Sequence, residues 1–319
     1  MPGVSVIIPA YNAADFITDA YRSVAAQTLN DWEIIFVNDA SQDDTLRTVR
    51  SLAAADKRVK VIDLPVNSGP AGARNAALAV AEGDWIALLD ADDRYSPNRL
   101  EVLTSAGAKN GADIVLDNLF VIDPISRRTA FYAFDQNRSD IATLPFSEFL
   151  RNNQSDTFFQ FGYLKPVIRR SWLASNNIKY PETLRHGEDL VFLLKCYARG
   201  ANVILLSKPY YHYSFQYSQT SGTKSPTTRT EVHFEPLLAA IEGFLEDTHL
   251  ASPEKRLLSS TCEATREAML FLEFRKCLRS HDINGVTHCL RHPIRLFKGV
   301  YFAKRRDFLW RRQIRMRLA

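Results

Sequence analysis

Three aspartates follow a short apolar run near residue 90. The run 85–89 has the composition of a buried strand, and Asp90, Asp92 and Asp93 come directly after it. Carboxylates this close repel one another unless a cation neutralises them, and hard oxygen ligands suit Mg²⁺ or Mn²⁺. We therefore expect Asp92 to bind a divalent cation where the strand ends. Aspartates that cap a following helix are the structural alternative.

Polar residues also follow three other strand-like runs. The segments are Pro9-Ala10-Tyr11-Asn12, residues 38–45 with Asp39, and residues 67–75 with Arg74. A ring such as Tyr11 can stack on a nucleobase, a carboxylate such as Asp39 can accept from a base N–H, and Arg74 beside a metal ion can neutralise a diphosphate. Taken singly, each residue also fits a packing, turn or capping role. Their joint occurrence favours a binding site for a nucleotide diphosphate.

These loops must be brought to one edge of a sheet. Strand-like runs occur at 4–9, 32–38, 59–64, 85–89 and 114–116, and helical periodicity occurs at 15–26, 45–55, 71–81 and 97–110. Alternating strands and helices predict an α/β fold with a mostly parallel sheet and helices on both faces. A further strand is expected at 202–206, and helices at 235–248 and 253–280.

Length and composition are those of a globular protein. The chain has 319 residues, of which 46% are hydrophobic and 24% are charged. We find no apolar run near the ~18 residues that a membrane span needs and no charged leader before residue 4, so we expect a cytoplasmic protein. The four cysteines have no metal-ligand spacing and are expected to be buried free thiols.

Positive charge is concentrated at the C-terminal end. Residues 291–319 hold ten Lys or Arg and one acid, a net charge of +9, whereas the preceding 290 residues carry −5. Leu290, Ile294, Phe297 and Tyr301 form one helical stripe with basic residues along the next. Such a helix can lie in a lipid interface. Packing onto protein or gripping nucleic acid are alternatives, and we favour an anionic membrane surface with no nucleic-acid partner.

The first 115 or so residues resemble the family 2 glycosyltransferases of the GT-A fold, which are inverting enzymes that use nucleotide-sugar donors. The resemblance is carried by residues 7–12, 37–43 and 67–75 and by the Asp90-x-Asp92 motif, with Asn38 where the family usually has a second Asp. It implies that Tyr11 stacks on the base and that Asp39 and Arg74 bind it. Pro9 would also line the donor site, Asp90 would lie near the ribose or metal, and Asp92 would bind the metal.

A second acidic pair, Glu188-Asp189, opens an apolar helical run. Acidic residues favour the first turn of a helix, so a structural role is an alternative. Family members carry an acidic pair here whose second member is the general base, and the resemblance therefore implies that Asp189 accepts a proton from the attacking sugar hydroxyl. His212, among tyrosines, is a candidate for the metal or diphosphate, with packing as the alternative.

Residues 161–172 also resemble bacterial exopolysaccharide transferases of the succinoglycan type. That narrower resemblance implies UDP-glucose as donor and a polyprenyl-diphosphate-linked oligosaccharide as acceptor. We expect a donor-binding half at 1–117, an acceptor-binding half with the base at 118–225 and a helical extension at 226–319, peripheral on the inner face of the plasma membrane. A nucleotidyltransferase that makes a nucleotide-sugar and a non-catalytic nucleotide-sugar-binding protein are the alternatives.

Overall fold

The computed structural model divides into two compact units. The first comprises residues 1–144 and 162–232, and the second comprises residues 145–161 and 233–319. The structure describes residues 2–122, 129–135, 140–154, 159–214, 234–246, 250–301 and 304. The tail from residue 305 lies outside these residues.

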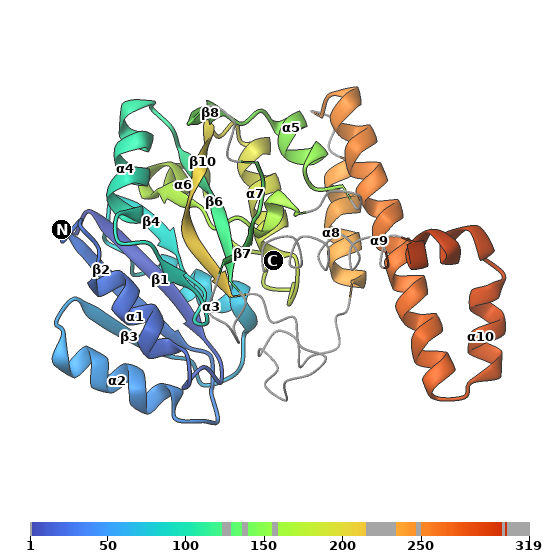
Figure 1. The fold of residues 1–319 in the computed structure, drawn as a ribbon, viewed down its shortest axis with the longest axis horizontal. Coiled ribbons are helices and arrows are strands. Elements are labelled where there is room, and N and C mark those ends of the chain that lie inside the picture. Colours follow the sequence, from blue (N-terminus) through green and yellow to red (C-terminus); the bar gives the residue numbers. More distant parts are fainter. Residues whose placement is uncertain are drawn as a thin grey trace. The chain divides into compact units, whose positions relative to one another are not determined.

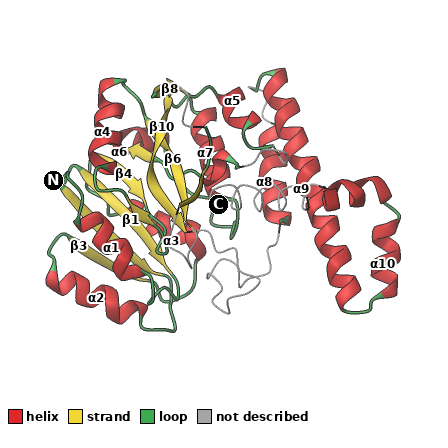
Figure 2. Cartoon of the chain, viewed as in Figure 1, coloured by secondary structure: helices red, strands yellow, loops and turns green. Residues whose placement is uncertain are grey.

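The first unit is an α/β domain whose described strands form one sheet (Figures 1 and 2). The strands are β1 (Val4–Ala10), β2 (Trp32–Asn38), β3 (Val59–Asp63), β4 (Trp85–Leu88), β5 (Arg94–Tyr95), β6 (Ile114–Ile122), β7 (Thr129–Tyr132), β8 (Ile141–Thr143), β9 (Val167–Arg169) and β10 (Val203–Ser214). The helices are α1 (Ile17–Ala25), α2 (Thr45–Ala55), α3 (Gly69–Leu78), α4 (Arg99–Lys109), α6 (Arg170–Asn176) and α7 (Glu188–Ala198).

The order of the strands is β3-β2-β1-β4-β9-β6-β10-β5, with β7 beside β6 and β8 beside β10. Strand β1 runs parallel to both β2 and β4, so the chain goes out to one side of β1 and then returns to the other. Sheets of this kind bind ligands at the carboxyl ends of the strands where the order reverses. The loops that follow β1, β2 and β4 therefore start from the edge where a ligand is expected.

The predicted alternation of strands and helices is confirmed in the first 110 residues, where β2 and α2 have the predicted bounds. The middle of the chain is more complex than the prediction. Strand β9 lies between β4 and β6 and is antiparallel to both. It has only three residues, too few for a period-two pattern to separate from the surrounding apolar sequence.

Strand β10 is interrupted where Pro209 pairs with Asn118 of β6, and its register shifts on both sides of the proline. Proline cannot donate a hydrogen bond to the sheet, which is why it is confined to edges and bulges. Side chains of β6 replace the lost bonds: Asn118 donates to the carbonyl of Ser207, and Asp117 accepts from the N–H of Tyr210. Beyond this bulge, Tyr211 continues the strand into the site described below.

The second unit is helical in its described residues (Figure 1). Its helices are α5 (Phe146–Arg151), α8 (Glu235–Leu245), α9 (Ser252–Arg279), α10 (Ile283–Leu290) and a helical stretch at 293–301. The stretch 293–301 buries Leu296, and Gly299 approaches so near the backbone of Glu267 that a Cβ there would collide with it. Among the described helices, none is both long and apolar enough to cross a membrane.

Candidate functional site

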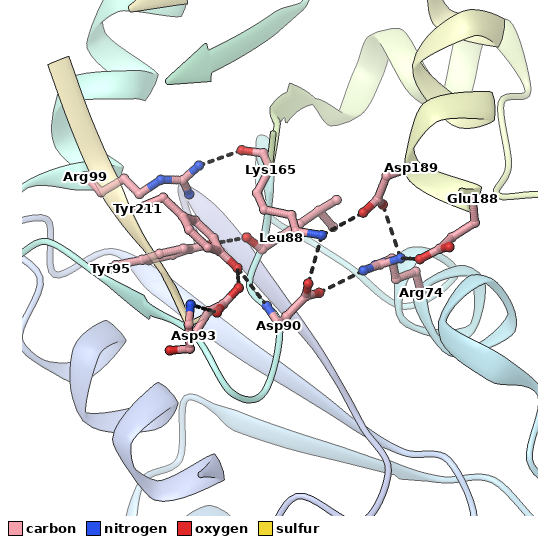
Figure 3. A network of polar contacts seen from close by, with 11 residues as sticks. Arg74, Leu88, Asp90, Asp93, Tyr95, Arg99, Lys165, Glu188, Asp189 and Tyr211 are labelled. Atoms are coloured by element: carbon pink, nitrogen blue, oxygen red, sulfur yellow. Dashed lines mark hydrogen bonds and ion pairs between the residues drawn. The ribbon is translucent and has the colours of Figure 1, made fainter. Parts of the chain in front are cut away.

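Arg74 is the centre of a buried network of ion pairs (Figure 3). Its Nη2 lies 2.8 Å from Asp90 Oδ1, and its Nη1 lies 2.7 Å from Glu188 Oε1 and 3.2 Å from Asp189 Oδ1. The side chain comes from α3 and is only 2% exposed. Three residues selected from the sequence, Arg74, Asp90 and Asp189, therefore lie together although they come from three different elements.

Lys165 is a second cation in this network. Its Nζ lies 2.8 Å from Asp90 Oδ2 and 2.7 Å from Asp189 Oδ2 (Figure 3). Burial alone would lower the pKa of Lys165, but the two carboxylates carry it above its ordinary value, so the ammonium is charged at neutral pH. Sequence reasoning gave Lys165 no role. The available signal was a lysine in an apolar stretch, between Leu164 and Pro166, because a lysine buried there needs an acidic partner.

Asp90 is held in its ionised form by these two cations. Burial would raise the pKa of its carboxyl group, but Lys165 and then Arg74 lower it to about 2. The backbone N–H of Asp90 also donates to the hydroxyl of Tyr211, at 3.2 Å. Asp90 is thus fixed at both its backbone and its side chain, and its carboxylate is negative over the whole physiological pH range.

Asp93 lies in the same turn but has a different environment. It accepts hydrogen bonds from the hydroxyl of Tyr211, at 2.6 Å, and from the N–H of Ser214, at 2.7 Å. Burial, followed by the charges of Asp92 and Asp90, raises the pKa of Asp93 well above its usual range. The turn leads into β5 rather than into a helix, so capping of a following helix does not explain these aspartates.

The two candidate metal ligands lie near this turn. Asp92 is partly exposed between Asp90 and Asp93, whereas His212 is on β10 opposite Arg94. The Nε2 atom of His212 lies 2.8 Å from the Ser96 hydroxyl, and its ring stacks on Phe120 with centroids 4.7 Å apart. Burial and then Arg94 lower the pKa of His212 to about 4, so its imidazole is neutral at pH 7. The described residues contain no group of three or more His, Cys, Asp and Glu side chains that could hold a metal ion.

Asp39 binds the beginning of helix α3. Its buried carboxylate accepts from the backbone N–H groups of Ser68, at 2.6 Å, and Gly69, at 2.8 Å. Burial raises the pKa of Asp39, and these two bonds act against that shift. Gly69 has φ +74, a left-handed backbone conformation that favours glycine.

The remaining candidates lie at the end of β1. Pro9 is partly buried near the end of the strand, and Tyr11 follows it with 38% of its surface exposed. Strand β1 runs parallel to β2, so its end lies beside the end of β2, after which Asp39 follows. The arrangement leaves an aromatic ring accessible at the same edge of the sheet as the buried carboxylate.

Three buried polar atoms around Arg74 have no hydrogen-bond partner among the described residues. They are Arg74 Nε, the hydroxyl of Tyr180 and Asp189 Oδ1. The ring of Tyr180 lies 5.2 Å from the guanidinium carbon of Arg74 and stacks on Phe192. Unsatisfied buried polar groups are costly, and water or a ligand often supplies the missing partner. The network therefore offers both donors and acceptors to a polar ligand.

The chain is similar to a known protein family and to a protein of polysaccharide biosynthesis. The model of glycosyl transferase family 2 matches residues 5–172. The succinoglycan biosynthesis protein ExoO of Rhizobium meliloti is 32% identical over 289 residues, which cover 89% of this chain and 80% of that protein.

Two solved structures share the fold at lower sequence identity. S. aureus TarS 1-349 in complex with UDP-GlcNAc has a TM-score of 0.64 and 22% identity, covering 86% of this chain and 73% of that one. The mannosyltransferase PcManGT from Pyrobaculum calidifontis, in complex with GDP-Man and Mn²⁺, has a TM-score of 0.58 and 18% identity, covering 96% of this chain and 86% of that one.

Proposed function

Because this chain belongs to glycosyl transferase family 2, we propose that it transfers a sugar, with glucose from UDP-glucose as the expected donor, to a saccharide acceptor with inversion. The proposal depends mainly on one observation: the carboxylate of Asp189 and the acidic turn after β4 share Lys165 and Arg74. The proposed proton acceptor and the proposed donor-binding motif therefore lie in one polar network. That is what a direct transfer between two bound sugars requires.

The proposed reaction is a single displacement. Asp189 accepts the proton of an acceptor hydroxyl while that oxygen bonds to the anomeric carbon of the donor sugar. The bond from that carbon to the diphosphate breaks on the opposite face, and UDP leaves with the bonding electrons. Oδ2 of Asp189 receives a hydrogen bond from Lys165, whereas Oδ1 lies 3.2 Å from Arg74 Nη1 without a hydrogen bond to it. Oδ1 is therefore the oxygen expected to take the proton.

Donor binding is assigned to the ends of β1, β2 and β4. Tyr11 would stack on the uracil, and Asp39 would accept from the base N–H. Asp39 already accepts from two backbone N–H groups. Its carboxylate can still accept from the base, because each oxygen can accept more than one hydrogen bond. Pro9 would line the base pocket, while Arg74 and Asp90 would lie toward the ribose and diphosphate.

The acidic turn fits a divalent cation. Mg²⁺ is commonly held by one or two carboxylates, while substrate phosphates and water complete its shell. Asp92 is a partly exposed carboxylate beside two others, and the neutral imidazole of His212 would have to exchange its contact with Ser96 to join it. When bound, Mg²⁺ or Mn²⁺ would neutralise the negative charge of the departing diphosphate.

The second unit is the proposed point of attachment to a membrane carrying a lipid-linked acceptor. Leu290 (53%) is exposed at the end of α10, and Ile294 (74%), Phe297 (70%) and Tyr301 (49%) are exposed on the helical stretch 293–301, so the stripe expected from the sequence is divided by the turn at 291–292. Arg291, Arg295 and Lys298 are exposed beside them, whereas Leu296 faces inward. An exposed apolar stripe bordered by cations fits an anionic lipid surface. We therefore propose that the protein acts at the cytoplasmic face of the membrane on a polyprenyl-diphosphate-linked oligosaccharide of exopolysaccharide synthesis.

The function can be tested with a panel of nucleotide-sugars and polyprenyl-diphosphate saccharides, incubated with the full chain in Mg²⁺ or Mn²⁺ and in EDTA. We expect release of UDP together with an acceptor longer by one sugar and inverted at the new linkage. Formation of pyrophosphate and a nucleotide-sugar from a sugar phosphate and UTP would instead identify a nucleotidyltransferase.

A further inference from the structure

Lys165 occupies a position that the reaction proposed above does not by itself explain. Its ammonium lies between Asp189 and Asp90, within 2.8 Å of each, and the residue is 4% exposed (Figure 3). Resting on the proposed function, we propose that Lys165 is a positioning residue: it fixes Oδ2 of Asp189 and, together with Arg74 at 3.2 Å from Oδ1, sets the direction in which Oδ1 meets the acceptor hydroxyl.

The backbone of Lys165 is anchored by a second buried ion pair. Arg99 Nη2 donates to the carbonyl of Lys165 at 2.6 Å. The same guanidinium pairs with Asp117 through Nη2 at 2.8 Å and through Nε at 3.2 Å, and both side chains are inaccessible to solvent. The ring of Tyr95 lies 4.4 Å from the guanidinium carbon. A long, flexible lysine side chain thus starts from a rigid point and ends between two carboxylates.

Lys165 also sets the charge around Asp189. The groups that face Asp189 are the cations Lys165 and Arg74, the carboxylates Glu188 and Asp90, and the neutral phenol of Tyr180. With both cations present, three carboxylates are balanced by two positive charges. Without Lys165, Arg74 alone would face all three carboxylates, and their mutual repulsion would be less well balanced.

The test compares Lys165→Met, Lys165→Gln and Lys165→Arg with the wild type. Lys208→Met is the matched control, because Lys208 is 61% exposed and pairs with the exposed Asp140, at 3.7 Å. The measurements are kcat against pH at saturating donor and acceptor, the Kd of UDP, and thermal unfolding. Lys165→Gln retains a hydrogen-bond donor without the charge, so it provides a second neutral variant if Lys165→Met does not fold.

In the neutral variants, we expect the acidic limb of the kcat profile to move to higher pH by about one to two units, since an adjacent opposite charge shifts a carboxyl by about one to three units. UDP should bind within about threefold of wild type, because Arg74 still pairs with Asp90 and the proposed base-binding residues Tyr11 and Asp39 are unchanged. Lys165→Arg should return the limb to its wild-type position, and Lys208→Met should not move it.

An unmoved acidic limb together with UDP affinity lowered more than tenfold would overturn the proposal and make Lys165 a contact of the donor diphosphate. An unmoved acidic limb with unchanged kcat would also overturn the proposal and would mean that Lys165 has only a structural role. Failure of the proposed function would look different, because the wild type would then bind UDP without transferring sugar from any donor.

Discussion

Asp90 and Asp189 come from distant parts of the chain, yet their carboxylates are joined through the single ammonium of Lys165, which lies 2.8 Å from one and 2.7 Å from the other. Asp90 follows strand β4, whereas Asp189 lies in the first turn of α7. This ionic link places the proposed proton acceptor next to the proposed donor site, and it makes the roles of the individual side chains separable by experiment.

Asp189→Asn should abolish transfer while sparing donor binding. The amide keeps the size of the carboxylate but cannot accept the proton of the acceptor hydroxyl, so kcat should fall by about 10² to 10⁴. Glycosyl transfer is measured by product mass, and UDP binding by calorimetry. Turnover close to that of wild type would mean that another group is the base.

Asp92→Ala should remove the response of donor binding to metal. If Asp92 holds the cation, Mn²⁺ will tighten UDP binding in the wild type but not in the variant. In EDTA the two proteins should bind UDP equally, which controls for unrelated damage. Retention of the full Mn²⁺ effect in the variant would assign the cation to other ligands.

Asp39→Ala should lower both uridine nucleotide affinity and stability. Two backbone N–H groups at the start of α3 would lose their acceptor, which costs about 0.5–2 kcal/mol at a helix N-terminus. Tyr11→Ala is the matched comparison, because it should weaken UDP binding by the ~1–3 kcal/mol of a stacked base and leave stability almost unchanged. Urea unfolding and UDP titration distinguish the two effects. A Tyr11→Ala protein with wild-type affinity would exclude the stacking role.

Glutamates placed on the exposed stripe should weaken membrane binding. Ile294→Glu with Phe297→Glu puts two negative charges where apolar side chains would enter an anionic lipid surface. Co-sedimentation with vesicles rich in phosphatidylglycerol should fall by at least tenfold for this double variant. The comparison is Val80→Glu, an exposed apolar residue of the first unit, which should sediment like wild type. Equal sedimentation of all three proteins would argue against this surface.

The first half of the fold was predictable because its signals are local. Strands β1–β4 are short apolar runs separated by amphipathic helices, and the expected GT-A architecture is confirmed by the shared fold of the glycosyltransferase structures. The short antiparallel strands β5, β7, β8 and β9 were missed. They have four residues or fewer, and their places in the sheet depend on partners far away in sequence.

The site residues were predictable where a short sequence motif itself indicates the chemistry. Arg74, Asp90 and Asp189 were selected from sequence and lie together, although the roles assigned to them remain predictions. Lys165 and Arg99 were not selected, because a single basic residue in the sequence does not reveal which carboxylate or carbonyl it meets after folding. The four cysteines are free and buried, as expected.

The interruption of β10 at Pro209 restricts how this chain can vary in length. Successive side chains of a strand point to opposite faces, so inserting or deleting a single residue between Ser207 and Tyr210 would turn the phenol of Tyr211 away from Asp93 and Asp90. Homologous chains that keep this acidic turn should therefore accommodate length changes in surface loops rather than in this stretch of strand.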